Sequence, residues 1–283
     1  MALINVISSP WAITTDAFNT LQNVYLSHLK KEKIDIASLG LPLKNEQKRY
    51  DIFDNVGVIH INGIIAKKMN MFTEISGGAS TQLIAKDLKE LIADASIDAI
   101  ILSIDSPGGS VDGTQELAQM VYESKKKKPI IAHSDGMIAS GAYWIASAAH
   151  EIYISSGVSR VGSIGVYTKH TEVSRAEEAM GIKTTEIFSG KYKAVGSPHK
   201  QLTADDKEYM QSELDYIYSL FVNDVARNRK ASVDGVLENM ADGRVFTGQK
   251  AVDAGLVDGF ESFDNLITLL KETGKNTLIS YRR

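Results

Sequence analysis

A serine followed by a glycine is the first feature of this sequence that could perform chemistry. The pair Ser140-Gly141 lies within Ala-Ser-Gly-Ala at 139–142, where the sequence predicts the start of a helix. The small neighbours leave the hydroxyl free to face a cleft, and the Gly141 N–H could stabilise the oxyanion formed when the hydroxyl attacks a carbonyl. Capping the helix is the more usual role of a serine at this position. This segment by itself leaves both interpretations open.

A second segment with possible chemistry is Ser-Pro-Gly-Gly at 106–109, between an apolar run and a helical pattern. Adjacent glycines allow backbone N–H groups to converge on a phosphate or an oxyanion, because no Cβ obstructs them. The same residues also form ordinary tight turns between a strand and a helix. The turn is therefore informative only in combination with other motifs.

A nucleophilic serine needs a base, and the sequence offers two kinds. None of the six histidines lies in a segment with an obvious orienting carboxylate. They are His28, His60, His133, His150, His170 and His199. A lysine can replace histidine when burial keeps its amine neutral, and Lys193 stands between an aromatic residue and small apolar residues. Because most lysines are surface charges, Lys193 is a candidate and no more.

The composition excludes several other kinds of site. The chain has no cysteine, which removes thiol nucleophiles, disulfides and cysteine-ligated metals. Its formal net charge of −4 gives no basis for nucleic-acid binding, and the lysine run at 125–128 suits the end of a helix. No run approaches the roughly 18 apolar residues of a membrane span. No basic residue precedes the apolar N-terminus, so we expect a cytoplasmic protein without a transmembrane anchor.

The elements that must position these residues alternate between short apolar runs and amphipathic segments. The alternation begins at Val56 and predicts an α/β core of strands covered by helices. The expected strands are Val56–Ile61, Ala99–Ile104, Pro129–Ser134, Ile152–Ile154 and Ser163–Tyr167. The expected helices are Thr81–Asp94, Thr114–Lys126, Gly141–Ala149 and Glu172–Met180, followed by helices over 204–228 and 233–240 and a terminal βα piece over 244–270. Residues 1–50, with a helical pattern over 17–33, are expected to form an N-terminal arm, and residues 51–283 the main domain.

Five motifs follow one another along the chain. They are Ser-Pro-Gly-Gly at 106–109, Ala-Ser-Gly-Ala-Tyr-Trp-Ile-Ala at 139–146, Val-Gly-Ser-Ile-Gly-Val at 161–166, Ser-Gly-Lys-Tyr-Lys-Ala at 189–194 and Ala-Asp-Gly-Arg-Val-Phe-Thr-Gly at 241–248. Together they resemble the signal peptide peptidase A family of serine proteases, and the resemblance extends from Val56 to Phe263. It implies the fold shared by Clp proteases and crotonases, a repeated ββα core with helices packed on the sheets.

The resemblance also implies a role for each motif. Ser140 becomes the nucleophile and Lys193 the general base of a Ser-Lys dyad. The N–H groups of Gly109 and Gly141 become the oxyanion hole, and Ser163 holds the lysine amine. Such an endopeptidase hydrolyses peptide bonds without a metal or an organic cofactor. Ring-shaped members of the family complete the dyad across a subunit boundary, so we expect a homo-oligomer that acts on a protein or peptide.

The resemblance leaves three hypotheses about the physiological role. The compact length and the arm with Pro-Trp-Ala-Ile at 10–13 resemble bacteriophage head-maturation proteases, which cut scaffold and capsid proteins in a prohead within the host cytoplasm. The second hypothesis is a bacterial cytoplasmic peptidase, and the third is a catalytically silent oligomeric assembly protein. A crotonase-like acyl-CoA enzyme is disfavoured, because it would have no use for a paired Ser140 and Lys193.

Overall fold

A six-stranded sheet forms the centre of the computed structural model, which describes residues 9–29, 50–68 and 78–274. The strands are, in spatial order, β13 (Gly259–Phe260), β10 (Glu151–Ile154), β8 (Ile130–Ser134), β6 (Ala99–Asp105), β3 (Val56–Asn62) and β2 (Tyr50–Phe53). All neighbours are parallel except β2 and β3. Strands β3, β6 and β8 are almost entirely buried, which is why they read as continuous apolar runs.

Long strands of this sheet lead to a short strand and then to a helix. β6 is followed by β7 (Gly108–Ser110) and α5 (Thr114–Ser124), and β8 by β9 (Met137–Ala139) and α6 (Gly141–Ser147). β3 leads through β4 (Ile65–Ala66) and β5 (Ala79–Ser80) to α4 (Thr81–Ala93). The short strands join two smaller sheets, which also contain β1 (Trp11–Ile13), β11 (Arg160–Gly162) and β12 (Val245–Thr247). The predicted ββα core is thereby confirmed.

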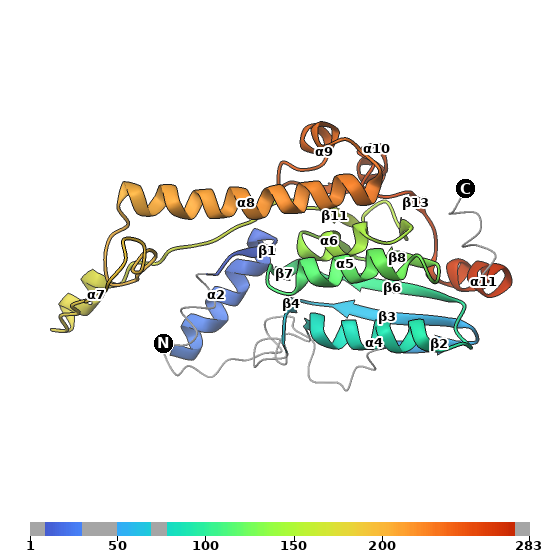
Figure 1. The fold of residues 1–283 in the computed structure, drawn as a ribbon, viewed down its shortest axis with the longest axis horizontal. Helices are drawn as coiled ribbons and strands as arrows, with labels where there is room; N and C mark the ends of the chain where they lie inside the picture. The colour runs from blue at the N-terminus through green and yellow to red at the C-terminus, as the bar shows by residue number, and fades with distance from the viewer. Residues whose placement is uncertain (1–8, 30–49, 69–77, 275–283) are drawn as a thin grey trace.

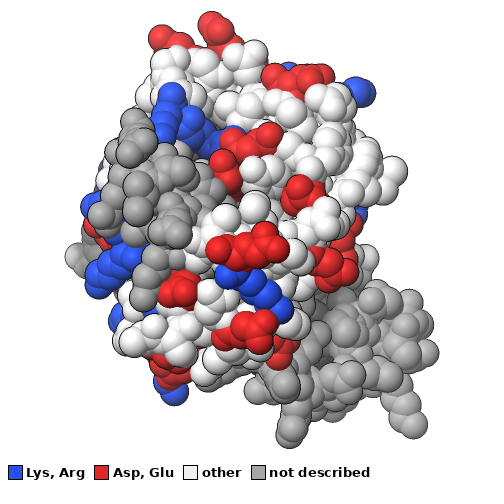
Figure 2. All heavy atoms as spheres, turned by 90° about the vertical axis from the view of Figure 1, so that its right-hand side faces the viewer, with Lys and Arg blue, Asp and Glu red and all other residues white. Residues whose placement is uncertain are grey.

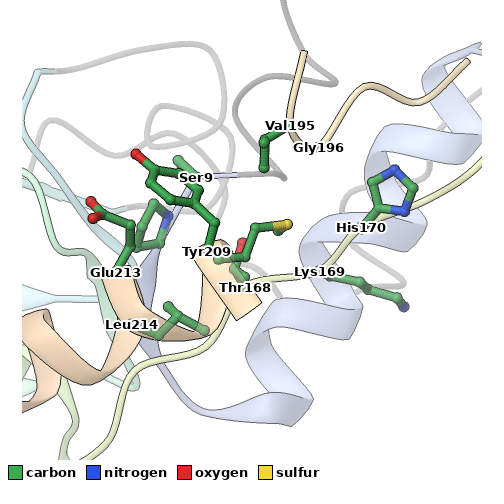
Figure 3. Close-up of a pocket in the computed structure, with 11 residues that line it drawn as sticks. Ser9, Thr168, Lys169, His170, Val195, Gly196, Tyr209, Glu213 and Leu214 are labelled. Atoms are coloured by element: carbon green, nitrogen blue, oxygen red, sulfur yellow. The ribbon is translucent and has the colours of Figure 1, made fainter. Parts of the chain in front are cut away.

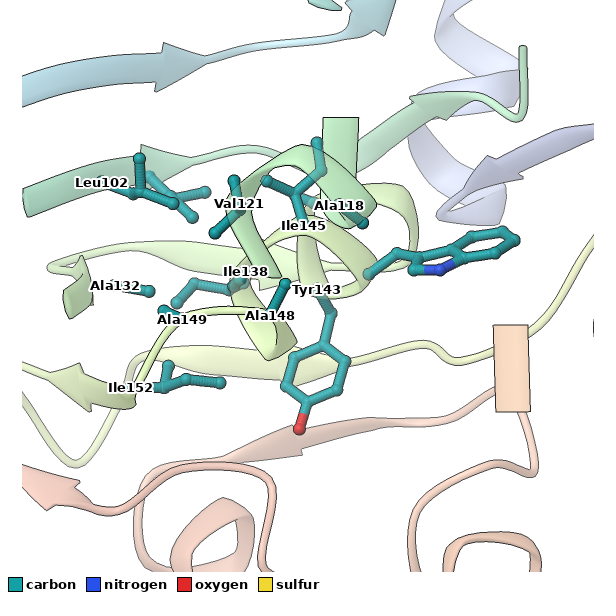
Figure 4. Close-up of a cluster of buried hydrophobic side chains, with 14 of the residues drawn as sticks. Leu102, Ala118, Val121, Ala132, Ile138, Tyr143, Ile145, Ala148, Ala149 and Ile152 are labelled. Atoms are coloured by element: carbon teal, nitrogen blue, oxygen red, sulfur yellow. The ribbon is translucent and has the colours of Figure 1, made fainter. Parts of the chain in front are cut away.

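The main hydrophobic core lies between the large sheet and the helices α5 and α6 (Figure 4). Leu102 and Ala132 of the sheet face Val121 of α5 and Ile145 of α6. Every residue of α6 is buried, so this helix crosses the middle of the domain. On the other face of the sheet, α11 (Phe263–Thr273) packs against β3 and β6. Because α6 is buried along its whole length, its position in the domain is fixed, and with it the position of Ser140.

The long helix α8 (Ala204–Arg229) runs along the body and projects beyond it (Figure 1). Its C-terminal part packs on α6, where the rings of Phe221 and Trp144 stack with centroids 4.3 Å apart. Its N-terminal part carries the segment 168–203, including α7 (Ser174–Ala179), to the end of the molecule away from the large sheet. Within the described residues, the remaining helices are α2 (Thr15–Leu29), α9 (Val233–Asn239) and α10 (Gln249–Asp253). We call the segment 168–203 the distal segment.

The predicted strand Ser163–Tyr167 is wrong. Strand β11 covers Arg160–Gly162 instead, and residues 163–167 are irregular apart from one bridge between Tyr167 and Trp11. The reason lies in the backbone, because Gly162 and Ser163 have φ of 116° and 52°, which a strand cannot continue through. The other expected elements differ mainly at their ends, and the part of the N-terminal helix beyond residue 29 lies outside the described residues.

The surface gives two further observations. In the part of the chain that the structure describes, none of the helices has the length and apolar character required to cross a membrane. On the face shown in Figure 2, acidic and basic side chains are interspersed rather than separated into patches of one sign.

Candidate active site

Ser140 stands at the junction between β9 and α6 in a strained conformation. Its φ of 54° and ψ of −120° are unusual for a residue with a side chain. Its N–H donates to the carbonyl of Gly162 (2.7 Å), and its hydroxyl lies 3.4 Å from the carbonyl oxygen of Gly165. The side chain makes no capping bond to α6, although Ser140 occupies the position that precedes the helix. Helix capping therefore does not explain this serine.

The glycines of the 106–109 turn lie directly beside Ser140. A Cβ placed on Gly108 would be 2.9 Å from the Gly141 nitrogen, and a Cβ placed on Gly141 would be 3.4 Å from the Gly109 nitrogen. Ser106 holds this turn in place, because its hydroxyl donates to the Gly63 carbonyl (2.6 Å) and accepts from the Gly108 N–H (3.2 Å). The two glycine motifs predicted from the sequence to cooperate therefore meet in space.

Ser163 directly follows Gly162, whose carbonyl accepts the N–H of Ser140. Its own N–H donates to the Arg244 carbonyl (2.7 Å), and its φ of 52° turns the chain away from β11. Ser163 is almost fully buried. The motif at 161–166 thus reaches the same junction as the motifs at 106–109 and 139–146.

Lys193 is not brought to Ser140 within this protomer. It lies in a run of turns in the distal segment, where its N–H donates to the Gly190 carbonyl (3.1 Å) and its side chain is exposed. It lines an open cavity of about 550 Å³, and all the residues that line this cavity lie within 186–199. Figure 1 shows the distal segment at one end of the molecule's long axis and α6 far from it, within the body of the domain. Of the candidate residues, Ser140, Gly109, Gly141 and Ser163 therefore gather, and Lys193 does not.

Four histidines of the described chain have partners other than Ser140. His60 pairs with Asp51 (3.0 Å) and His199 with Glu177 (2.8 Å). His133 bonds to the hydroxyl of Ser155 (3.0 Å). Burial lowers the pKa of His150 to about 4, and Nδ1 of this residue accepts the N–H of Ile130 (3.1 Å). None of these four contacts orients an imidazole toward the serine.

Buried polar contacts fix the helix that carries Ser140. The Trp144 indole donates to the Asp224 carboxylate of α8 (2.9 Å), and the Tyr143 hydroxyl donates to the Leu256 carbonyl (2.9 Å). Burial raises the pKa of the Tyr143 phenol, so this side chain stays a neutral donor. Among the described residues, no group of three or more His, Asp or Glu side chains could hold a metal ion.

The sequence did not predict that the N-terminal strand β1 belongs to this site. β1 pairs antiparallel with β7, and the register places Ala12 opposite Gly109. The Ala12 carbonyl oxygen is 3.1 Å from the place of a Cβ on Gly141. The only signal was the apolar run Trp-Ala-Ile after Pro10, which is too short to identify a strand by periodicity.

Comparison with known proteins identifies the family of this chain. The model of peptidase family S49 matches residues 122–277, which is more than half of the chain. A protein of Methanocaldococcus jannaschii with the name "Putative protease MJ0651" is 36% identical over 65% of this chain and 59% of its own length. Capsid assembly protease C of Escherichia phage lambda is 30% identical over 80% of this chain and 51% of its own length. A ClpP1 mutant from Listeria monocytogenes is a solved structure similar over 74% of this chain and 94% of its own, with a TM-score of 0.45 and 15% identity.

The matched region includes α6 with its preceding serine, Ser163 and the distal segment. The chain spans between about half and three fifths of the length of the first two relatives. On the match to the family model, this chain belongs to peptidase family S49.

Proposed function

We propose that this protein is a serine endopeptidase with Ser140 as its nucleophile and Lys193 as its general base. The observation that carries the proposal is the backbone of Ser140, held at a positive φ beside the Gly109 and Gly141 amides. Strain of this kind costs roughly 1–3 kcal/mol and is concentrated at functional sites. A serine that neither caps its helix nor lies at the surface has little other reason to adopt it.

The proposed reaction uses only groups of the chain and water. The Lys193 amine removes the proton of the Ser140 hydroxyl as Oγ attacks the carbonyl carbon of the substrate. The N–H groups of Gly109 and Gly141 bind the resulting oxyanion. Collapse of this tetrahedral intermediate breaks the C–N bond of the substrate, and the lysine passes its proton to the leaving amine. Water, deprotonated by the same amine, then hydrolyses the acyl-serine and restores the free hydroxyl.

We further propose that Lys193 acts on the Ser140 of a second copy in a homo-oligomer. Support comes from the distal segment, which carries Lys193 away from its own Ser140 and exposes apolar side chains to solvent. These include Met180, Ile182, Ile187, Phe188 and Tyr192, and Ile187 is 95% exposed. Neighbouring apolar exposure of this kind marks an interaction surface. A second copy is the occupant that would also complete the dyad.

Mixing two inactive variants tests both proposals. Ser140→Ala retains the lysine, and Lys193→Ala retains the serine, so each should be inactive alone. If the dyad joins two copies, random co-assembly of an equal mixture should restore about one quarter of the sites. Half of the sites then contain an intact Ser140, and half of those receive an intact Lys193 from the neighbouring copy. A mixture that stays inactive while each variant assembles normally would contradict the shared site.

Lys191→Ala is the matched control. Lys191 lies in the same run of turns, is exposed and pairs with Asp205 at 3.5 Å, and exposed pairs contribute little to stability. This variant should keep wild-type cleavage. Lys193→Arg should be inactive, because a guanidinium cannot be deprotonated at working pH. Activity in Lys193→Arg would refute the lysine as a base.

For the substrate, we propose capsid or scaffold protein of a phage, cut in the prohead within the host cytoplasm. Support comes from the relative in phage lambda, which is named capsid assembly protease C and matches 80% of this chain. In this arrangement residues 51–283 are the protease domain and residues 1–50 an arm. Incubation of candidate capsid and scaffold proteins with wild type and Ser140→Ala tests this, since only wild type should yield fragments. Cleavage of cellular peptides alone would favour the bacterial peptidase instead.

A further inference from the structure

The N-terminal strand β1 is hydrogen-bonded along both of its edges beside Ser140. On one edge the Trp11 N–H donates to the Tyr167 carbonyl, and the Tyr167 N–H donates to the Trp11 carbonyl, both at 2.8 Å. On the other edge β1 runs antiparallel to β7, the strand that contains Gly109. A three-residue segment between two such edges has the arrangement of an extended peptide bound by strand addition.

The ladder defines which backbone groups face the candidate oxyanion hole. The Thr14 N–H donates to the Pro107 carbonyl (3.0 Å), and the Val111 N–H donates to the Pro10 carbonyl (3.5 Å). Hydrogen-bonded pairs alternate along an antiparallel ladder. The pair midway between them, Ala12 and Gly109, is therefore of the hydrogen-bonded kind, and the Ala12 carbonyl faces the Gly109 N–H.

The Ala12 carbonyl also lies against the second candidate donor. Its oxygen is 2.2 Å from the place of a Cβ on Gly108 and 3.1 Å from the place of a Cβ on Gly141. The Cβ place on Gly108 is itself 2.9 Å from the Gly141 nitrogen. A carbonyl oxygen of the chain thus stands where the proposed reaction needs the carbonyl oxygen of a substrate.

We propose that β1 is a built-in inhibitory strand, a segment of the chain that fills the substrate groove and that a peptide substrate must replace. The inference rests on the proposed function, because it assigns Gly109 and Gly141 to the oxyanion hole. Ala12 then takes the position of the residue whose carbonyl would be attacked. The residue at this position is small and fully buried, which predicts a preference for small side chains there.

The packing of β1 suits a segment that can leave. β1 is the last strand of its four-stranded sheet, and its other edge carries the bridge to Tyr167. The buried side chains of this region form a cluster of their own, with Trp11, Ile13 and Phe18 at its centre. The chain enters β1 along an open cavity of about 390 Å³, which Ser9 and Pro10 line together with Tyr209 of α8 (Figure 3). A bound peptide longer than β1 would have room to continue there.

A reversible cross-link tests the proposal on the full chain. Trp11 and Ser110 face each other in the register, one position from the hydrogen-bonded pair. Pairs of this kind have Cα atoms about 4.5 Å apart, within the range that a disulfide spans. The variant Trp11→Cys/Ser110→Cys can form no other disulfide within one chain, because the sequence has no cysteine of its own. Oxidation locks β1 in place, and reduction frees it.

Two measurements follow on this variant. Fluorophosphonate labelling of Ser140 should be at least tenfold slower in the oxidised form than in the reduced form. With Ser140→Ala added, a fluorescent peptide of residues 9–14 should bind the reduced form and not the oxidised form. Trp11→Cys alone, treated with the same oxidant, is the control and should label at one rate throughout.

The outcomes separate the inference from the proposed function. Equal peptide binding by both forms, which would place the peptide outside the groove, or binding by neither form would overturn the inhibitory strand. Labelling at the same rate in both forms would overturn it as well while supporting the nucleophile. Peptide binding by the reduced form alone, with labelling in neither form, would support the inhibitory strand and refute the proposed nucleophile.

Discussion

Gly109→Ala is expected to disrupt both the stability of the protein and its proposed activity. A Cβ on Gly109 would lie 1.9 Å from the carbonyl oxygen of Ile65 and 2.5 Å from its carbonyl carbon. Ordinary contacts of a Cβ begin near 3.4 Å. The backbones of β4 and β7 would therefore have to separate by about 1.5 Å, and a shift of that size breaks the bridge between Ile65 and Gly109.

The expected loss of stability is about 2–4 kcal/mol. Overpacking of a close-packed site costs roughly 1–3 kcal/mol, at the upper end where the obstacle is backbone, and a lost hydrogen bond adds about 1 kcal/mol. Movement of the Gly109 N–H would in addition remove one oxyanion donor, which is worth about 10²- to 10³-fold in kcat. Urea unfolding followed by circular dichroism measures the first quantity and peptide cleavage the second.

Gly157→Ala is the matched control for this substitution. No atom lies within 4 Å of a Cβ placed on Gly157, and its backbone is outside the left-handed region. Alanine there should leave the free energy of unfolding unchanged or raise it by up to about 1 kcal/mol, because it restricts the unfolded chain. The reasoning is refuted if Gly109→Ala unfolds within 0.5 kcal/mol of this control, taken as about the size of an ordinary surface effect.

Two further predictions concern buried polar groups. Trp144→Phe should lower the free energy of unfolding by about 2–4 kcal/mol, because the Asp224 carboxylate loses the indole donor at 2.9 Å and the ring stacked on Phe221 becomes smaller. Urea unfolding by circular dichroism checks this, and a loss below about 1 kcal/mol would contradict the hydrogen bond's contribution. For His150, burial and the nearby Lys125 lower the pKa to about 4 in the folded protein, below the 6.5 of an ordinary histidine, so the unfolded chain binds the proton more readily. Stability is then fully present above about pH 6.5 and falls as the pH drops toward 4, by about 1–2 kcal/mol after allowance for solvent screening of this partly exposed ring. His150→Asn keeps an acceptor for the Ile130 N–H and should flatten that part of a pH series of urea unfolding curves, whereas an unchanged slope would exclude His150 as its source.

The ββα core was accessible from the sequence because its strands and helices are encoded locally. Buried parallel strands read as apolar runs wherever they occur, and β3, β6 and β8 lie within one residue of their expected bounds. Gly109 and Ser140 each follow such a strand at the same edge of the sheet, so the repeat of the fold brings them together. The strand expected at 163–167 failed because two positive φ values, at Gly162 and Ser163, are set by contacts that the pattern does not reveal.

Only the tertiary structure decided where β1 and Lys193 lie. A strand of three residues has no periodicity to read, and its register depends on Gly109 and Tyr167, partners far away along the chain. Lys193 is separated from Ser140 because α8 continues past the core, and a helical pattern predicts length without predicting what covers each part of the helix. The sequence alone therefore determined which residues are candidates for the site, since residue type and local pattern suffice for that. The addition of β1 to the site and the separation of Lys193 from Ser140 within one protomer depended on contacts between distant segments, which local patterns do not specify.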